Sequence, residues 1–311
     1  MRFIGFGLVV SFIVIGCFTA QTLPKSMIET QHIIAEEPRT PVSSPTGIPK
    51  PTKRSFFNSL AYGVPGMEDV QVHNVEYASF EGKPLTVDIY YPPDGMDEAP
   101  FPSVIFVFGY KTSAIDLRNF YQYESWGRLV AAEGIVGIAY DTERPNVDLE
   151  TLIAFLQEHA AEFKIDPERI GLWASSSNVP TAMSYVMQEG EDIAKFAVLY
   201  YGHMLSPDNY LREEINAQCA QRGCYSKELK DIQQIRSDLP LFIVRAGRDV
   251  LPHVNESIDH FMANFADEAI PITYIEYKDG LHGFDVEQRT DQSAEIIEKT
   301  IKFMKLHLGI D

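Results

Sequence analysis

Six short, mostly apolar runs alternate with amphipathic segments of helical length along most of this sequence. Their hydrophobicity is continuous rather than alternating, which is typical of parallel strands covered on both faces. Strands that alternate with helices favour right-handed βαβ crossovers. The sequence therefore predicts an α/β fold, with a doubly wound, mostly parallel sheet and helices on both faces. The six runs are residues 103–108, 135–140, 170–174, 196–201, 241–246 and 272–277.

Further elements are expected on either side of these runs. Residues 70–79 and 85–91 are predicted to form a pair of early strands, the first of which has period-two alternation. Helices are predicted at residues 149–163 and 257–265, and a C-terminal helix that packs on the sheet is predicted at 292–308.

The N-terminal residues 1–20 contain a mostly apolar run behind one cationic side chain. The run is short for a transmembrane helix and close to the core of a signal peptide. Within it, Val-Ile-Gly-Cys resembles the lipobox of bacterial lipoproteins, which predicts lipidation at Cys17. Cleavage after Ala20 would place bulky Phe18 where a small residue is needed, and an uncleaved signal anchor is the alternative. In each case the mature protein is expected to be exported.

Residues 21–66 are predicted to be a semi-extended tether, since no helical or strand period runs through them. Prolines occur there at positions 24, 38, 41, 45, 49, 51 and 65, among serine, threonine and charged residues. All of the predicted strands and helices then fall within residues 67–311, which we expect to form one domain.

The charge balance limits the classes of partner. The chain has 44 Asp and Glu against 26 Lys and Arg, which gives a formal net charge of −18. Such a surface repels phosphate backbones and anionic lipid headgroups. We therefore expect no nucleic-acid partner, and contact with a membrane only through the N-terminal segment.

Three adjacent serines, residues 175–177, stand at the end of the apolar run at 170–174. In a parallel sheet, chemistry gathers at the carboxyl ends of the strands. A nucleophile elbow has the pattern G-x-S-x-G, with small residues two before and two after the serine, because strand and helix pass close together there. Three serines in this place are either such an elbow or a polar cluster that caps the following helix.

The steric requirement of an elbow selects one of the three serines. Ser176 has Ala174 two residues before it and Asn178 two residues after it. Asparagine tolerates unusual backbone angles better than most residues. Ser175 would instead place a tryptophan at the tight position before it, and Ser177 would place a β-branched valine after it. Ser176 is therefore the predicted nucleophile, although neither elbow glycine is present.

A serine hydroxyl needs a base that removes its proton and an acid that orients the base. Asp249 follows the run at 241–246 in the segment Ala-Gly-Arg-Asp, and His282 lies in the loop Asp-Gly-Leu-His-Gly-Phe after the last predicted strand. These two are the predicted acid and base. The alternatives are a purely structural His282, and Asp279 or Asp285 in place of Asp249.

From residue 85 to residue 308 the sequence resembles the α/β-hydrolase superfamily, and in particular its dienelactone-hydrolase-like branch. The segments that carry the resemblance are DPERIGLWASSSNVP, AGRD, DGLHGF and LTVDIYYPP. The resemblance implies an α/β-hydrolase fold and the chain order Ser, Asp, His. Dienelactone hydrolases proper have a cysteine nucleophile at the position of Ser176, so their substrate is not carried over.

The same resemblance implies an oxyanion hole built from two backbone N–H groups. One belongs to the residue after the nucleophile, Ser177. The other comes from the loop after residues 103–108, where the sequence reads Phe-Gly-Tyr-Lys, and we assign it to Tyr110. Phe108 stands where related families often have histidine.

The cysteines suggest a disulfide. Cys219 and Cys224 enclose Ala-Gln-Arg-Gly, and a loop containing glycine can bring them within bonding distance. Two reduced thiols are the alternative, and pairing leaves Cys17 for lipidation. Cys219 and Cys224 lie in the segment 203–237, which is long for a connection between two strands. This segment is either part of a pocket wall or a plain surface excursion.

The sequence predicts an exported serine hydrolase that cleaves a carboxylic ester of a small molecule through an acyl-enzyme, without a metal or organic cofactor. Phosphate-binding glycine loops and the zinc motif H-E-x-x-H are absent from it. Two alternatives stay open: a binding protein that keeps the fold without catalysis, and a peptidase or amidase that uses the same three residues.

Overall fold

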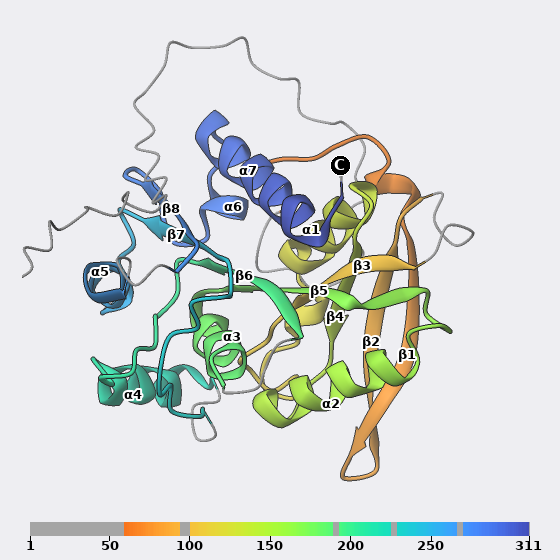
Figure 1. Cartoon of the computed structure of the whole chain (residues 1–311), viewed down its shortest axis with the longest axis horizontal. Helices are drawn as coiled ribbons and strands as arrows, with labels where there is room; N and C mark the ends of the chain where they lie inside the picture. Colours follow the sequence, from red (N-terminus) through yellow and green to blue (C-terminus); the bar gives the residue numbers. More distant parts are fainter. Residues whose placement is uncertain (1–58, 94–99, 189–192, 225–228, 266–269, 311) are drawn as a thin grey trace, which may run out of the picture.

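The structure is a computed structural model that describes residues 59–93, 100–188, 193–224, 229–265 and 270–310. A central sheet separates two layers of helices, with α1 and α7 on one face and α2 and α3 on the other (Figure 1). The helices are α1 (Tyr121–Ala132), α2 (Pro145–Glu158), α3 (Val179–Val186), α4 (Arg212–Arg222), α5 (Val254–Phe265), α6 (Phe284–Glu287) and α7 (Asp291–Leu308).

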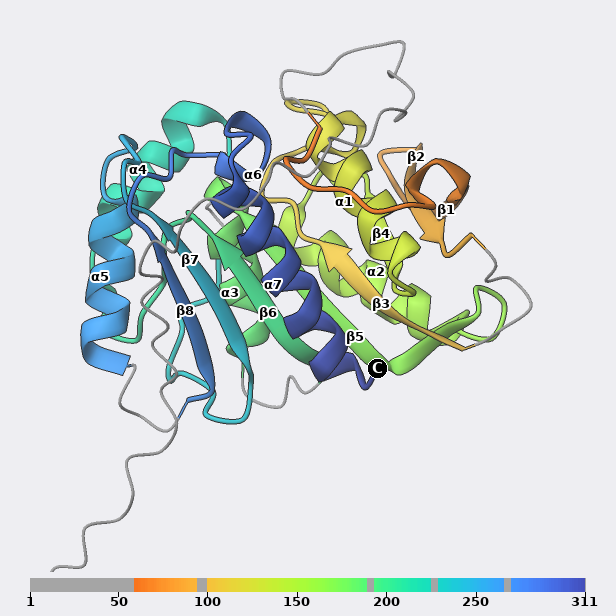
Figure 2. The same cartoon turned by 90° about the horizontal axis from the view of Figure 1, so that it is seen from above.

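The sheet has eight strands in the order β1-β2-β4-β3-β5-β6-β7-β8. The strands β1 and β2 pair antiparallel with each other, β2 pairs antiparallel with β4, and all remaining pairs are parallel. Figure 2 shows β1 and β2 at one edge and β8 at the other. This arrangement confirms the predicted doubly wound, mostly parallel sheet. The strands are β1 (Gln71–Phe80), β2 (Lys83–Tyr91), β3 (Phe101–Phe106), β4 (Val136–Tyr140), β5 (Ile165–Ser175), β6 (Ala194–Tyr200), β7 (Leu241–Ala246) and β8 (Ile272–Tyr277).

The continuous hydrophobicity of the central strands follows from burial on both faces. Every residue of β4 is buried, and so are the last six residues of β5. Trp173 on β5 packs against Trp126 on α1, with ring centroids 5.1 Å apart, and both side chains are fully buried. These contacts fix β5, and with it the turn that carries the serines, in the centre of the molecule.

The observed bounds of α2 differ from the predicted helix at 149–163. The helix begins earlier because Oδ2 of Asp148 accepts hydrogen bonds from the backbone N–H groups of Glu143 and Arg144, at 2.8 and 2.7 Å. This carboxylate satisfies donors that a helix start leaves unpaired, and Pro145 is well suited to the first turn. The prediction missed this cap because it began from the first apolar residues of the helix.

Residues 59–66, which the sequence assigns to the tether, lie against the domain. Leu60 is buried, and the backbone N–H of Ala61 donates to the carbonyl oxygen of Asp285 at 2.7 Å. The signal segment 1–20, Cys17 and the rest of the tether lie outside the described residues. Within the described part of the chain, no helix combines the length and apolar character that crossing a bilayer requires.

Candidate active site

The turn after β5 holds Ser176 in an unusual backbone conformation. Its φ is 57°, in the left-handed region, whereas Ser175 is extended with a φ of −132° and Ser177 is not among the residues with positive φ. Side chains other than glycine rarely adopt this region, and such strain gathers at functional sites. Ser176 opens a short 3-10 turn, Ser176–Asn178, that leads into α3. The strained turn singles out the same serine that the steric argument selects.

The crowding that an elbow requires is met by glycines on the neighbouring loops. A Cβ at Gly202, after β6, would lie 2.4 Å from the carbonyl oxygen of Ser176. A Cβ at Gly109, after β3, would lie 2.7 Å from the carbonyl oxygen of Ser177. Both loops therefore touch the turn through their backbones, and Ala174 beneath it is fully buried. The small residues that this close approach needs stand on two neighbouring loops and at the end of β5 rather than within one motif.

The structure brings together Ser176, His282 and Asp249, which come from three different loops. Oγ of Ser176 lies 2.7 Å from Nε2 of His282, and Nδ1 of the same ring lies 2.6 Å from Oδ2 of Asp249. The side chain of Asp249 is fully buried, while that of His282 is 27% exposed. A carboxylate beside Nδ1 holds the ring proton on that nitrogen, which leaves Nε2 free to accept the serine proton.

Backbone contacts between the loops after β7 and β8 set the separation of the acid and the histidine. The N–H of Gly247 donates to the carbonyl of Tyr277 at 2.8 Å, and the N–H of Arg248 donates to that of Gly280 at 2.8 Å. Oδ1 of Asp249 also accepts the N–H of Leu251 at 2.9 Å. The carboxylate is thus held by its own loop before it meets the imidazole.

The two alternative acids point elsewhere. Asp285 is fully buried, and its carboxylate accepts hydrogen bonds from the hydroxyl of Tyr201, from Nε1 of Trp126 and from Nε2 of Gln122. Burial raises the pKa of Asp285, although the three donors oppose this. Asp279 is exposed on the loop before the histidine. Asp249 is the carboxylate that contacts the imidazole.

The loop that carries Tyr110 lies directly against the serine turn. Gly109 contacts the backbone of Ser177, as its close approach shows, and its N–H donates to Oδ1 of Asn178 at 2.7 Å. Tyr110 itself pairs with Cys224 in an isolated antiparallel bridge. The loop therefore meets the serine turn at Gly109, the residue before Tyr110.

Phe108 fills an aromatic slot behind this loop. Its ring stacks on Tyr140 with centroids 5.3 Å apart and meets Tyr123 edge-on at 4.7 Å. All three rings are buried. A histidine here would need hydrogen-bond partners for its ring nitrogens within this buried slot.

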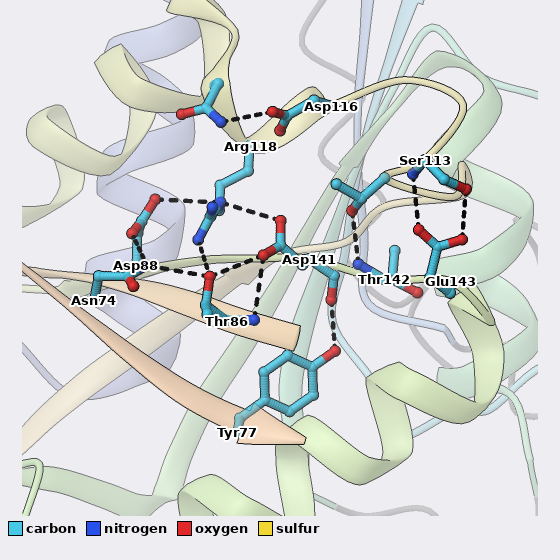
Figure 3. A network of polar contacts seen from close by, with 12 residues as sticks. Asn74, Tyr77, Thr86, Asp88, Ser113, Asp116, Arg118, Asp141, Thr142 and Glu143 are labelled. Atoms are coloured by element: carbon cyan, nitrogen blue, oxygen red, sulfur yellow. Dashed lines mark hydrogen bonds and ion pairs between the residues drawn. The ribbon is translucent and has the colours of Figure 1, made fainter. Parts of the chain in front are cut away.

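A polar network at the carboxyl end of β4 holds the far end of the same loop (Figure 3). The N–H of Thr112 donates to the carbonyl of Thr142 at 2.6 Å, and the N–H of Thr142 donates to the hydroxyl of Thr112 at 2.8 Å. Ser113 donates through its N–H and its hydroxyl to the carboxylate of Glu143, at 2.8 and 2.6 Å. Arg118, further along, lies between the carboxylates of Asp88 and Asp141 in the same view.

The segment 203–237 contributes one wall of a cavity beside the serine turn. Cys219 and Cys224 are joined by a disulfide, and their Cα atoms are 4.8 Å apart. The cavity has a volume of about 10 Å³, and neither Ser176 nor His282 lines it. The residues that line the cavity are Ser177, Pro180, His203, Ile215, Gln218, Cys219, Arg222 and Cys224. Within the described residues, no group of His, Cys, Asp and Glu side chains is arranged to hold a metal ion.

Sequence reasoning selected Asn178 for a backbone property that the structure does not use. The φ of Asn178 is −85° and its ψ is −20°, an ordinary helical conformation. Its side chain is 3% exposed and is hydrogen-bonded at both ends, to Gly109 and to Tyr123. Only the three-dimensional arrangement reveals these partners, because both are distant in the chain.

Neither a family model nor a curated protein sequence matches this sequence. Several solved structures are similar to it in fold. The esterase Est2 of the planctomycete Thermogutta terrifontis is 20% identical, with a TM-score of 0.59 over 78% of this chain and 94% of that one. The α/β hydrolase MGS-M1, from a Medee basin deep-sea metagenome, is 14% identical, with a TM-score of 0.56 over 78% of this chain and 99% of that one.

A third similar structure comes from a study of two esterases of the fungus Rhizomucor miehei. It is 16% identical, with a TM-score of 0.57 over 77% of this chain and 85% of that one. Each alignment covers most of both chains while the identity stays low, so the likeness concerns the architecture. Together with the order of the eight strands and the helices on both faces, it shows that this chain has the α/β-hydrolase fold.

Proposed function

We propose that the protein is a serine hydrolase that cleaves carboxylic esters of small molecules. One observation carries the proposal: Ser176, in a strained strand-to-helix turn, lies 2.7 Å from the imidazole of His282, whose other nitrogen lies 2.6 Å from buried Asp249. Nucleophile, base and orienting acid are thus within hydrogen-bond reach of one another, which is the geometry that nucleophilic catalysis by serine needs.

The reaction follows from these contacts in two halves. Oγ of Ser176 attacks the carbonyl carbon of the ester while its proton passes to Nε2 of His282, and Asp249 stabilises the imidazolium that forms. The carbonyl oxygen becomes an oxyanion, which the N–H groups of Ser177 and Tyr110 bind. The intermediate collapses to an acyl-enzyme as Nε2 returns the proton to the leaving alcohol. Water then repeats these steps on the acyl group and releases the acid.

The preference for esters rests on the similar structures. Several of them are esterases, and the Thermogutta terrifontis enzyme is described both with propionate bound and phosphonylated by sarin. An activated serine attacks the phosphorus atom of such compounds and displaces their leaving group, which leaves the serine phosphonylated. The segments AGRD and DGLHGF lead us to place the chain in the dienelactone-hydrolase-like branch of the fold.

We further propose that the protein is exported and anchored through lipid at Cys17. The lipobox-like sequence before Cys17 supports this, as does the disulfide between Cys219 and Cys224, because disulfides persist in oxidising compartments. The proline-rich segment would then hold an acidic domain away from a membrane that repels it.

Labelling with a fluorophosphonate, together with turnover of a short-chain p-nitrophenyl ester, tests the function. Wild type should be labelled and active, and Ser176→Ala should lose labelling and roughly 10⁴-fold or more of kcat. Ser184→Ala, a buried serine on α3 whose hydroxyl accepts the N–H of Lys230, is the control and should keep both. A wild type that binds esters without labelling or turnover would instead be a binding protein with this fold. Turnover of amides but not of esters would favour the peptidase or amidase reading.

A further inference from the structure

Asn178 occupies the place where a nucleophile elbow usually has its second glycine, and its side chain is fully engaged. Oδ1 accepts the backbone N–H of Gly109 at 2.7 Å, and Nδ2 donates to the hydroxyl of Tyr123 at 2.7 Å. Asn178 and Tyr123 are 3% and 2% exposed. These are short, buried hydrogen bonds that connect three elements distant in the sequence.

The Gly109 end of this connection bears directly on the proposed oxyanion hole. Gly109 precedes Tyr110, and Asn178 follows Ser177. The two residues that this hydrogen bond joins are therefore the chain neighbours of the two residues whose N–H groups are proposed to bind the oxyanion. A Cβ at Gly109 would lie 3.2 Å from the Cα of Asn178, so the two backbones are in contact at this point. The hydrogen bond thus joins the two chain segments that carry the proposed donors.

The Tyr123 end fixes Asn178 itself. Tyr123 lies on α1, and its ring meets Phe108 edge-on with centroids 4.7 Å apart. The amide of Asn178 is thereby held in one orientation, with the oxygen toward Gly109. This assignment of oxygen and nitrogen is required by the partners, because the Gly109 N–H can only donate.

The loop that carries Gly109 and Tyr110 is held by separate hydrogen bonds at its other end, at Thr112 and Ser113. Thr112 pairs with Thr142, and Ser113 donates to Glu143 (Figure 3). At the near end, Gly109 contacts the serine turn and offers no side chain of its own, while Tyr110 pairs with Cys224. The side chain of Asn178 adds the hydrogen bond from the Gly109 N–H to the serine turn at this end.

We infer that Asn178 is a positioning residue, which holds the Gly109–Tyr110 backbone in register with Ser177 so that both N–H groups converge on the carbonyl oxygen of the substrate. The inference rests on the proposed function. Hydrogen-bond donors stabilise an oxyanion when they are fixed before it forms. An elbow glycine in place of Asn178 would leave the Gly109 N–H without this acceptor, and the loop would be free to shift.

The test compares Asn178→Ala, Tyr123→Phe and the double variant with wild type, for kcat, KM and amide hydrogen exchange at Gly109 and Tyr110. Asn178→Ala should lower kcat by about 10- to 100-fold. KM should change by less than about threefold, because substrate binding in the ground state does not need the oxyanion donors. Exchange at Gly109 should become faster. Tyr123→Phe should change kcat and exchange in the same direction by less, and the double variant should be no worse than Asn178→Ala alone.

Thr300→Val is the matched control, since it removes a buried hydroxyl that contacts Tyr200 and lies on α7, on the opposite face of the sheet from α3. It should lower the melting temperature while leaving kcat and Gly109 exchange unchanged. Wild-type kcat and exchange in Asn178→Ala, or additive losses in the double variant, would overturn the inference. A wild type without ester turnover would contradict the proposed function, and the exchange data would still decide whether Asn178 holds the loop.

Discussion

The hydroxyl oxygen of Tyr201 lies 2.5 Å from Oδ1 of the fully buried Asp285, and the ring of Tyr201 presents its edge to the imidazole of His282, with centroids 4.8 Å apart. Oδ2 of the same carboxylate accepts hydrogen bonds from Trp126 at 3.0 Å and Gln122 at 2.9 Å. The carboxylate takes no part in the proposed reaction. It holds, through its hydrogen bond to the Tyr201 hydroxyl, a ring that contacts the imidazole of His282.

Asp285→Asn should remove a dependence of stability on pH. Burial raises the pKa of Asp285 in the folded protein above its value of about 4 in the unfolded chain. The folded state therefore keeps this proton to higher pH than the unfolded state does. The free energy of unfolding falls as pH rises from about 4 through the folded-state pKa. An asparagine has no such proton, and its amide can satisfy Tyr201, Trp126 and Gln122.

Urea unfolding of both proteins between pH 4 and pH 7 measures this effect. The difference in unfolding free energy, variant minus wild type, should become more positive as pH rises, since other titrating groups are common to both. A difference that is constant across this range would show that Asp285 titrates alike in the folded and unfolded states.

Asp249→Asn should lower kcat by roughly 10³- to 10⁴-fold, with little change in KM. The amide can present its NH₂ group to Nδ1 of His282, which would move the ring proton to Nε2 and block acceptance of the serine proton. Asp279→Asn is the matched control, because this carboxylate is exposed on the loop before the histidine. Comparable losses in both variants would mean that the negative charge of the region, rather than the 2.6 Å contact with the imidazole, supports the reaction.

The sheet and the positions of the three proposed catalytic residues could be predicted because the signals are local. A strand buried on both faces must be apolar along its length, and a polar residue at its carboxyl end is visible from the adjacent sequence. The contact between Asn178 and Gly109 spans 69 positions, and no local pattern encodes it. The packing of residues 59–66 was missed because Leu60 is its one buried residue, and the half-buried Ala61, Tyr62 and Val64 show no helical or strand period in a proline-containing stretch.

Gly202→Ala adds a single methyl group and should abolish or strongly reduce activity. The added Cβ would lie 2.4 Å from the carbonyl oxygen of Ser176 and 2.3 Å from Cγ2 of Val179, so the serine turn or the loop after β6 must move. Misplacing a nucleophile by about 1 Å can cost on the order of 100-fold in rate. Steady-state kinetics measure this loss. Overpacking a tight site also destabilises by about 1–3 kcal/mol, which a urea titration would report. An unchanged kcat would show that the turn tolerates a displaced neighbour.

The cysteines should divide into one disulfide and one lipidated residue. The chain has three cysteines, and the structure joins Cys219 to Cys224, which leaves Cys17 for the lipobox-like motif. Detergent-extracted protein, denatured without reductant and treated with iodoacetamide, should therefore show no alkylation, and its intact mass should correspond to a lipid-modified chain that begins at Cys17. Reduction should expose two thiols. An unmodified chain that begins at Gln21 would refute the anchor. Alkylation of all three cysteines without reductant would refute both the anchor and the disulfide, since neither modification could then protect a thiol.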